Sequence, residues 1–265
     1  MVRHLVYALI AITWAAMTGI LVKREVLDKR APGPEAGYAA VLTPDRRDYQ
    51  SRMGIYLRGE RWGTAELFFY YPPEPEVGYS IDQDITMEVP PSVPWLDGVG
   101  STIARIHTTI SVDAEMQPTS FTVTLESPLV SGRVEGRRAG QQMRVRSAIG
   151  NQVKEYAVDL PPTDVITPGL LPVLPVAHLR QGDRWSVVSF DPFTFRQIRA
   201  VVEVQGTEVI RIGRRVMNTK VLAISQSGTT LKAWVDSRGE ILRAMGLFNI
   251  MLEKEDLPLE AEEPS

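Results

Sequence analysis

Apolar and polar side chains alternate in short segments along most of this chain. In residues 103–113, for example, Ile106 and Ile110 share one parity, whereas His107 and Thr109 share the other. A period of two is typical of a β-strand that has one buried face and one solvated face. The same alternation recurs at Phe121, Val123 and Leu125, and it continues almost to the C-terminus. The pattern therefore predicts a protein built mainly from β-strands.

Glycine, proline and asparagine separate these segments at short intervals, and no helix-length crossover lies between the strands of the first half. Hairpin connections of this kind join antiparallel neighbours. We expect an all-β fold, a large antiparallel sheet curved into a half-barrel or sandwich, preceded by one N-terminal transmembrane helix. The expected strands are 54–58, 62–71, 78–89, 103–113, 121–125, 134–136, 143–149, 153–158, 184–190, 193–205, 208–211, 215–226, 229–236, 240–245 and 248–254, with residues 136–140 as one of the turns.

The segment from Leu160 to Leu179 interrupts this pattern with five prolines. Proline excludes a long helix there, so a short helical turn or an apolar flap is expected. The flap, residues 168–176, would cover the open side of a curved sheet and admit an apolar ligand. The alternative is that it fills the core permanently. The candidate ligand-binding residues are Leu170, Leu171, Val173 and Leu174.

A second proline-rich loop, residues 90–100, holds two large apolar side chains, Trp95 and Leu96. Tryptophan at an exposed loop is a frequent anchor of protein interfaces, and it is as often a packed residue that holds the loop down. We therefore take Trp95 and Leu96 as candidate partner-binding residues.

The N-terminus carries an uncharged run from Leu5 through Trp14 to Val22. As a helix, the run would span roughly 27 Å, close to the thickness of a bilayer core. A cleaved signal peptide is the alternative, with a weak small-residue site near Ala15 or Thr18. Because apolar residues continue past both sites, an uncleaved single-pass anchor is favoured. The excess of Lys and Arg after the run would hold the C-terminal flank inside, whereas a short N-terminal flank before a large domain is typical of a signal anchor that exports the domain.

These features divide the chain into an anchor with its basic flank (residues 1–30), a linker (31–48), a β-rich domain (49–254) and an acidic tail (255–265). Residues 1–30 hold five of the 29 basic and two of the 32 acidic residues, so the remainder has a net charge of −6. A nucleic-acid-binding domain would present a basic balance instead. The partners that we expect are the membrane, a protein in the membrane or envelope, and a lipid as a further option, with no nucleic acid.

Candidate chemistry is sparse. The chain has no cysteine, which removes thiol catalysis, disulfides, cysteine-bound metal and a lipoprotein anchor. The histidines His4, His107 and His178 have no metal-site spacing, and no serine stands in a nucleophile elbow. We expect no metal, no cofactor and no catalytic residue. A pair of carboxylates is the one catalytic alternative that stays open, among Asp82, Asp84, Glu88, Asp113, Glu115 and Asp191.

Four stretches, taken in order, resemble the β-rich domain that precedes the catalytic module in bacterial transglutaminase-like exported proteins. They are residues 53–63 (MGIYLRGERWG), 179–185 (LRQGDRW), 190–194 (FDPFT) and 232–243 (KAWVDSRGEILR). The last pattern is also similar to periplasmic β-domains of unknown function and to domains like lipoprotein carriers. The resemblance covers residues 50–254 and implies the same scaffold and an exported location. On this ground we expect the inner (cytoplasmic) membrane, with the β-domain on the periplasmic side.

In physical terms, these stretches mainly contain residues that favour turns. Gly59 and Gly239 suit positive φ, Asp191 and its following proline set a turn, and tryptophans occupy a half-buried pleat. The catalytic module of that family uses a cysteine nucleophile, and this sequence has none. The resemblance therefore implies a scaffold without an active site.

The sequence thus favours a membrane-anchored exported β-domain that is not an enzyme. It would act as a protein-interaction module or as an accessory subunit of an envelope assembly. The first alternative is a carrier or sensor of lipid that uses the concave sheet face under residues 168–176. The second alternative is a hydrolase with an unrecognised carboxylate site.

Substitutions in the two proline-rich segments separate the first two functions. A carrier is expected to lose its lipid when Leu171→Asp or Leu174→Asp is introduced, because a carboxylate opposes apolar contact, and to stay folded. An interaction module is expected to tolerate both changes and to lose its partner with Trp95→Ala. Mass spectrometry of the full-length protein in mild detergent would score lipids and proteins together. Unfolding of the aspartate variants would place the segment in the core.

Overall fold

A computed structural model describes residues 35, 48–71, 78–89, 102–128, 130–161, 165–166, 179–226, 228–246 and 249–255. The chain divides into two units, Met1–Gly33 and Pro34–Ser265, and every described residue belongs to the second. No helix among the described residues is long and apolar enough to cross a bilayer. The expected anchor, Leu5 to Val22, lies outside them.

The described residues form fifteen strands and no α-helix. Their bounds are β1 Tyr49–Leu57, β2 Glu60–Tyr70, β3 Tyr79–Val89, β4 Thr102–Val112, β5 Pro118–Glu126, β6 Ser131–Ala139, β7 Gln142–Ile149, β8 Gln152–Asp159, β9 Val165–Ile166, β10 Arg184–Asp191, β11 Arg196–Ile212, β12 Arg215–Gln226, β13 Thr229–Val235, β14 Ile241–Met245 and β15 Ile250–Lys254.

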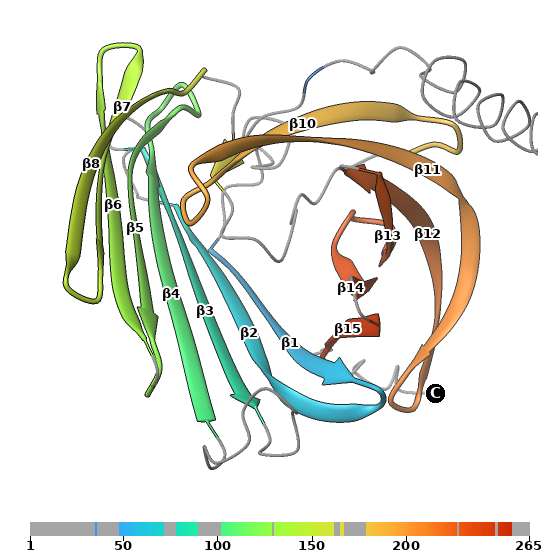
Figure 1. The fold of residues 1–265 in the computed structure, drawn as a ribbon. Helices are drawn as coiled ribbons and strands as arrows, with labels where there is room; N and C mark the ends of the chain where they lie inside the picture. Colours follow the sequence, from blue (N-terminus) through green and yellow to red (C-terminus); the bar gives the residue numbers. More distant parts are fainter. Residues whose placement is uncertain are drawn as a thin grey trace, which may run out of the picture. The chain divides into compact units, whose positions relative to one another are not determined.

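All of these strands belong to one open sheet, in the order β8-β7-β6-β5-β4-β3-β2-β1-β15-β14-β13-β12-β11-β10-β9 (Figure 1). Neighbours in the sheet are also neighbours in the chain, except where β1 pairs with β15. That pairing runs from Met53 opposite Lys254 to Leu57 opposite Ile250. The sheet therefore consists of two runs of strands, β1–β8 and β9–β15, in which every consecutive pair except β9–β10 is a hairpin, and β1 and β15 join the two runs edge to edge.

This architecture confirms the expected all-β class and the large sheet. The described strands form one continuous sheet, whereas two packed sheets were the alternative expectation. The pairs are antiparallel except for β9 and β10, where Val165 lies opposite Ser189 in a parallel pair. A two-residue strand has no alternation to detect, so this pair was missed. Residues 193–205 and 208–211 were predicted as two strands, but β11 runs through both because a bulge at Val204 and Gly206 absorbs the irregularity.

Two further expectations at turns need correction. Residues 136–140 were predicted as a turn, but β6 continues to Ala139 and carries Arg137 within the ladder, opposite Arg144 of β7. Gly136 is an extended strand residue that lies under an aromatic ring. The residue is glycine because of this close packing, and in the sequence it was interpreted as a turn signal. Phe193 was placed in a strand, whereas it lies in the turn before β11.

In the first eight strands, the buried apolar side chains lie on one side of the sheet. Val123, Val134 and Val145 mark this inner face and are at most 2% exposed, whereas their sequence neighbours on the outer face are mainly polar. The sheet turns this face inward, because the ring centroids of Phe121 on β5 and Phe190 on β10 are 6.0 Å apart. The two runs of strands thus share one main core, and burial of this apolar area stabilises the sheet.

A smaller cluster lies apart from the main core. It consists of Ile210, Ile212, Val221, Trp234 and Leu242. The bulge in β11 shifts the side-chain parity, so residues after it face the opposite way from those before it. The half of the β11–β12 hairpin that lies beyond the bulge therefore packs against the neighbouring strands. There the side chain of Arg243 donates a hydrogen bond to the backbone oxygen of Arg211 at 2.6 Å.

The close approach of Phe121 to β6 explains why residue 136 is glycine. A Cβ atom at Gly136 would lie 2.0 Å from Cε1 of Phe121, whose ring is 2% exposed and has no space to move. We expect Gly136→Ala to lower the free energy of unfolding by about 1–3 kcal/mol through overpacking. Urea unfolding followed by circular dichroism measures this change.

Gly132→Ala is the matched control, because Gly132 lies on the same strand and its Cβ would be 3.1 Å from the Ile149 side chain. Ile149 is 39% exposed, so its side chain can shift. Equal destabilisation by the two substitutions would contradict the proposed packing of Phe121.

Candidate functional site

One edge of the sheet is exposed over the whole length of a strand. β8 is the last strand on the β1–β8 side, and among the described residues it pairs only with β7. Seven of its eight residues are exposed, including Val153 at 57% and Tyr156 at 36%. An edge strand offers a row of backbone N–H and C=O groups that another strand can bind. β8 therefore has the properties of a strand-pairing site.

The C-terminal end of β8 is held in place. The ring of Tyr156 stacks on Phe195, with 4.4 Å between ring centroids, and the Gln197 side chain donates to the backbone oxygen of Asp159 at 2.9 Å. Both partners belong to the start of β11 and the turn that precedes it. The edge is thus a fixed element of the fold and not a frayed terminus, and a rigid edge costs little conformational entropy when it binds.

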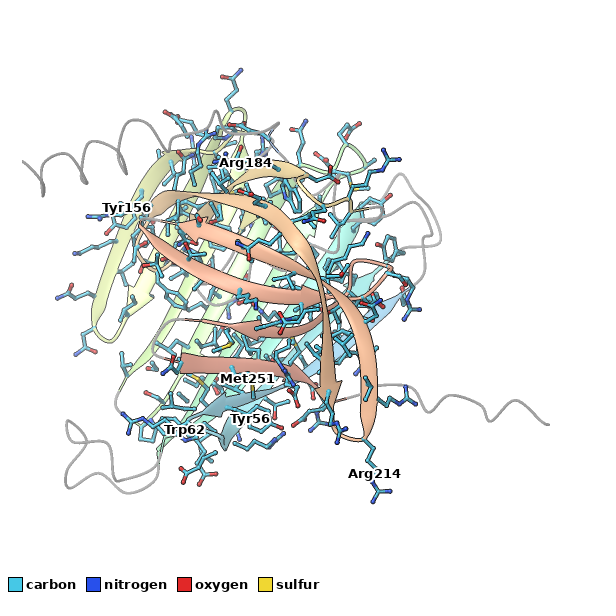
Figure 2. All side chains as sticks on the ribbon, turned by 90° about the vertical axis from the view of Figure 1, so that its right-hand side faces the viewer. Tyr56, Trp62, Tyr156, Arg184, Arg214 and Met251 are labelled. Carbon is cyan, nitrogen blue, oxygen red and sulfur yellow. The ribbon has the colours of Figure 1, made fainter. Side chains whose placement is uncertain are left out.

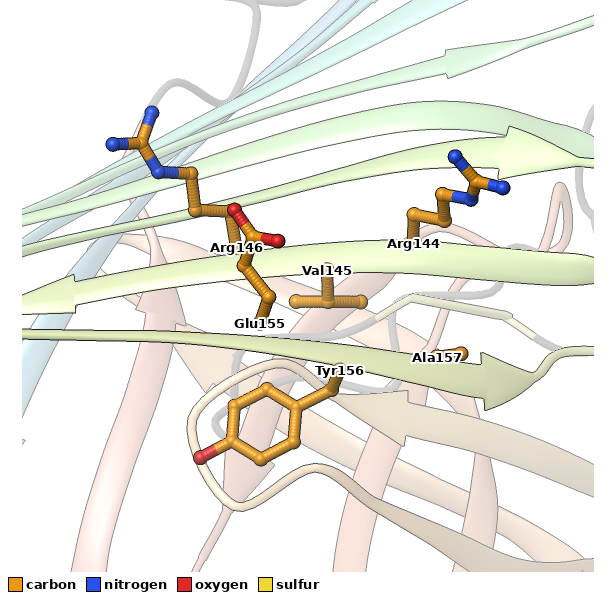
Figure 3. A pocket seen from close by; sticks show the side chains of 6 residues that line it. All are labelled: Arg144, Val145, Arg146, Glu155, Tyr156 and Ala157. Carbon is orange, nitrogen blue, oxygen red and sulfur yellow. The ribbon is translucent and has the colours of Figure 1, made fainter.

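The outer face beside this edge carries arginines. On neighbouring strands Arg137 lies directly opposite Arg144, and the residues that continue this cross-strand row are Ser120 and Ala157. A hollow of about 440 Å³ adjoins the row and is lined by Arg144, Val145, Arg146, Glu155, Tyr156 and Ala157. Figure 3 shows Arg144 and Arg146 on the same side of β7, whereas the ring of Tyr156 points to the other side.

The next row of the outer face is balanced in charge. It runs Thr122, Glu135, Arg146 and Glu155, so Arg146 has a carboxylate on each side. Arg133 donates to Glu135 at 2.5 Å. The excess positive charge therefore lies at the Arg137–Arg144 pair, for which no carboxylate stands in the same row.

The inner face holds a row of polar residues among apolar ones. Its buried polar members are Ser51, Gln83, Thr108 and Ser147, with exposures of 6%, 8%, 1% and 5%. The Thr108 hydroxyl oxygen has no hydrogen-bond partner within the described part of the chain. The complete row crosses eight strands through successive paired positions, in the order Ser51, Leu67, Gln83, Thr108, Val123, Val134, Ser147 and Lys154.

Charged groups also join β1, β2 and β15 on the outer face. Arg61 donates to both carboxylate oxygens of Glu255, at 2.8 and 3.0 Å. These bonds lower the pKa of Glu255 and raise that of Arg61. Burial, followed by the Glu255 charge, raises the pKa of Tyr56, which lies opposite Met251 (Figure 2). Each shift favours the protonation state that is present at neutral pH, so the cluster is suited to a structural role at this joint.

A histidine on the outer face has the hydrogen-bond order of a hydrolase triad. His107 Nδ1 lies 2.6 Å from Asp84 Oδ1, and its Nε2 lies 3.2 Å from the Thr109 hydroxyl. The side chains of Asp84 and His107 are each 50% exposed. The group lies in the middle of β3 and β4, two interior strands of the described sheet, so their backbone N–H groups are used in the ladder and are not available to an oxyanion.

Of the other candidate carboxylates, Asp82 lies on the same face as Asp84, directly opposite Thr109, and two others serve turns. Asp113 accepts from the backbone N–H of Gln117 at 2.8 Å, and Asp191 accepts from that of Phe193 at 2.9 Å and from the Thr194 hydroxyl at 2.8 Å. Within the described residues, no three histidine or acidic side chains converge as metal ligands. The following candidates lie outside the described residues: Leu5, Trp14, Val22, His4, Trp95, Leu96, Leu170, Leu171, Val173, Leu174 and His178.

The edge strand and the arginine row were not identified from the sequence. Arg144 and Arg146 alternate with apolar residues, a pattern that indicates one solvated face of a strand. Residues 137 and 138, however, were assigned to a turn. The order of strands in the sheet decides which strand is an edge, and that order depends on the β1–β15 pairing.

The chain was compared with known proteins. No family matches it, and no curated protein matches it. A search of solved structures found the crystal structure of a DUF1089 family protein from Pseudomonas aeruginosa. The two chains are 13% identical, the match covers 72% of this chain and 94% of the other, and the TM-score is 0.36. At this distance the likeness carries no information on what this chain binds.

The Thr108 hydroxyl, which has no hydrogen-bond partner within the described residues, leads to a prediction about stability. We expect Thr108→Val to raise the free energy of unfolding by about 1–3 kcal/mol, because it removes a buried polar group and keeps the side-chain shape. Urea unfolding checks this, with Thr86→Val on the exposed face of β3 as the control, expected within about 0.5 kcal/mol of the wild type. A loss of stability in Thr108→Val would show that the hydroxyl has a partner.

Proposed function

We propose that this chain is a non-enzymatic binding domain, held at a membrane by residues 5–22, that acts as an interaction module or accessory subunit of an envelope assembly. The observation that carries the proposal is the exposed edge of β8. In the proposed complex, a strand of a partner protein pairs with this edge and extends the sheet.

The composition of β8 supports strand addition. It contains no proline or glycine, and its two adjacent charges, Lys154 and Glu155, point to opposite faces of the sheet. Natural sheets usually protect a long edge with proline, a bulge or inward charges; β8 has no proline and no bulge, and its inward charge is the single residue Lys154. Val153 and Tyr156 add exposed apolar surface on the two faces, which supplies side-chain contacts for a bound strand.

A carrier of an apolar ligand is the second candidate, and the inner polar row favours it. The row places hydroxyl and amide groups inside an otherwise apolar face, and Thr108 has no described partner there. Such a face suits a lipid that has a polar group along its length, with the segment 168–176 proposed as its cover.

Charge placed on the exposed edge tests the first proposal. Val153→Lys is expected to lower recovery of a stoichiometric partner at least tenfold, because lysine at an edge strand opposes pairing with another chain. The measurement is mass spectrometry of the full chain extracted in mild detergent from its own membrane. Thermal unfolding should stay close to the wild type, since residue 153 is 57% exposed.

Val209→Lys is the matched control for this experiment. Val209 is 64% exposed on β11, at a distance from the β8 edge in the strand order. It should keep the partner. Full recovery of the partner by Val153→Lys, or equal loss in both variants, would refute strand addition at β8. A lone protein that carries a defined lipid would favour the second candidate.

A further inference from the structure

The outer face of β6 and β7 carries an arrangement that strand addition does not use. Arg137 and Arg144 occupy directly opposed positions of an antiparallel ladder. Opposed residues have Cβ atoms about 4.5–5.5 Å apart, and like charges in such a pair repel each other. Both side chains are exposed, and neither forms an ion pair with any described residue.

The neighbours of this pair do not neutralise it. Continued across the sheet, the row holds Ser120 on one side and Ala157 on the other, which are an uncharged hydroxyl and a methyl group. In the adjacent row, Glu135 is already engaged by Arg133 at 2.5 Å. On the other side, Asp159 accepts a hydrogen bond from Gln142 at 2.9 Å. The pair therefore stands as a local excess of positive charge.

A space for a ligand adjoins the pair. The hollow of about 440 Å³ extends along β7 and β8, and Arg144 and Arg146 both line it (Figure 3). Ala157 lies opposite Arg144, and its small side chain leaves space between the larger side chains that line the hollow. The volume falls within the range of small-ligand sites, about 300–1,000 Å³.

We infer that Arg137 and Arg144 bind a phosphate group whose ester substituent lies in the hollow. Each guanidinium offers a planar fork of donors, and two forks from neighbouring strands supply enough N–H groups for an oxyanion with three or more oxygens. A carboxylate has only two oxygens and would leave part of the donors unused. Arg146 and Glu155 also line the hollow, so a polar or zwitterionic substituent would find charged partners there.

A phosphate ester of this kind has two sources, a phospholipid headgroup and a soluble phosphate compound. The same two arginines would serve both, and the inference is independent of partner binding at β8. The experiment therefore uses the full chain in an uncharged detergent, with inorganic phosphate, glycerol 3-phosphate and dihexanoyl phosphatidylglycerol as separate probes. Binding is measured by isothermal titration and by the shift of the thermal unfolding midpoint.

The wild type is expected to bind at least one phosphate ester, and its unfolding midpoint should rise relative to sodium chloride at the same ionic strength. Arg144→Gln and Arg137→Gln should each weaken that binding at least tenfold and abolish the rise in the midpoint. Both variants should fold at least as well as the wild type at low salt, because each removes the repulsion of a like-charge pair.

Arg214→Gln is the matched control. Arg214 is exposed at the turn between β11 and β12, away from Tyr156 and the hollow (Figure 2). It changes the net charge equally and should bind like the wild type. Selective binding of the lipid probe assigns the site to a headgroup, and selective binding of the soluble ester assigns it to a free metabolite. The inference is overturned if no probe shifts the midpoint beyond chloride, or if Arg144→Gln responds as the wild type does.

Discussion

The pairing of β1 with β15 is the constraint on which the rest of this sheet depends. It is the one place in the described residues where strands distant in the chain are neighbours, and it joins two runs of strands that would otherwise end in four free edges. A buried polar group lies at this joint. Lys254, 5% exposed, forms an ion pair with Glu240, and the Tyr49 hydroxyl donates to the same carboxylate at 2.5 Å. An ion pair of this kind adds little net stability, but it penalises every register that separates the charges.

The position of the exposed edge follows from this joint. With β1 and β15 in the middle of the sheet, the two remaining edges are β8 and β9. β9 has only two residues and lies close to β5, so it offers little backbone to a partner, whereas β8 is eight residues long and exposed. The same arrangement places the outer face of β6–β8 next to a free edge. One end of the sheet therefore combines the strand-pairing site and the arginine pair.

Local features of this fold were readable from the sequence, and the strand order was not. Gly59 and Gly239 have φ values of 84°, as their turn positions predicted, and Asp191 caps its turn with two hydrogen bonds. These outcomes depend on a few adjacent residues. The edge strand depends on which strands meet across the chain, and alternation carries no information on that. The arginine pair was missed for a related reason, since opposed positions become visible only when the register of two strands is known.

The pairing of β1 with β15, the first and last of the described strands, has a consequence for biogenesis. During synthesis, the hairpins of β1–β8 can form as they emerge, but β1 has to wait for residues 250–254 before its second edge is covered. Contacts such as that between Tyr49 and Glu240 span 191 residues, and contacts of such high sequence separation form late. Until then the apolar inner face and an unpaired central strand are exposed together. Exposed apolar surface and an unpaired strand edge favour association with other chains, so this chain is most prone to aggregate before residues 250–254 have been made.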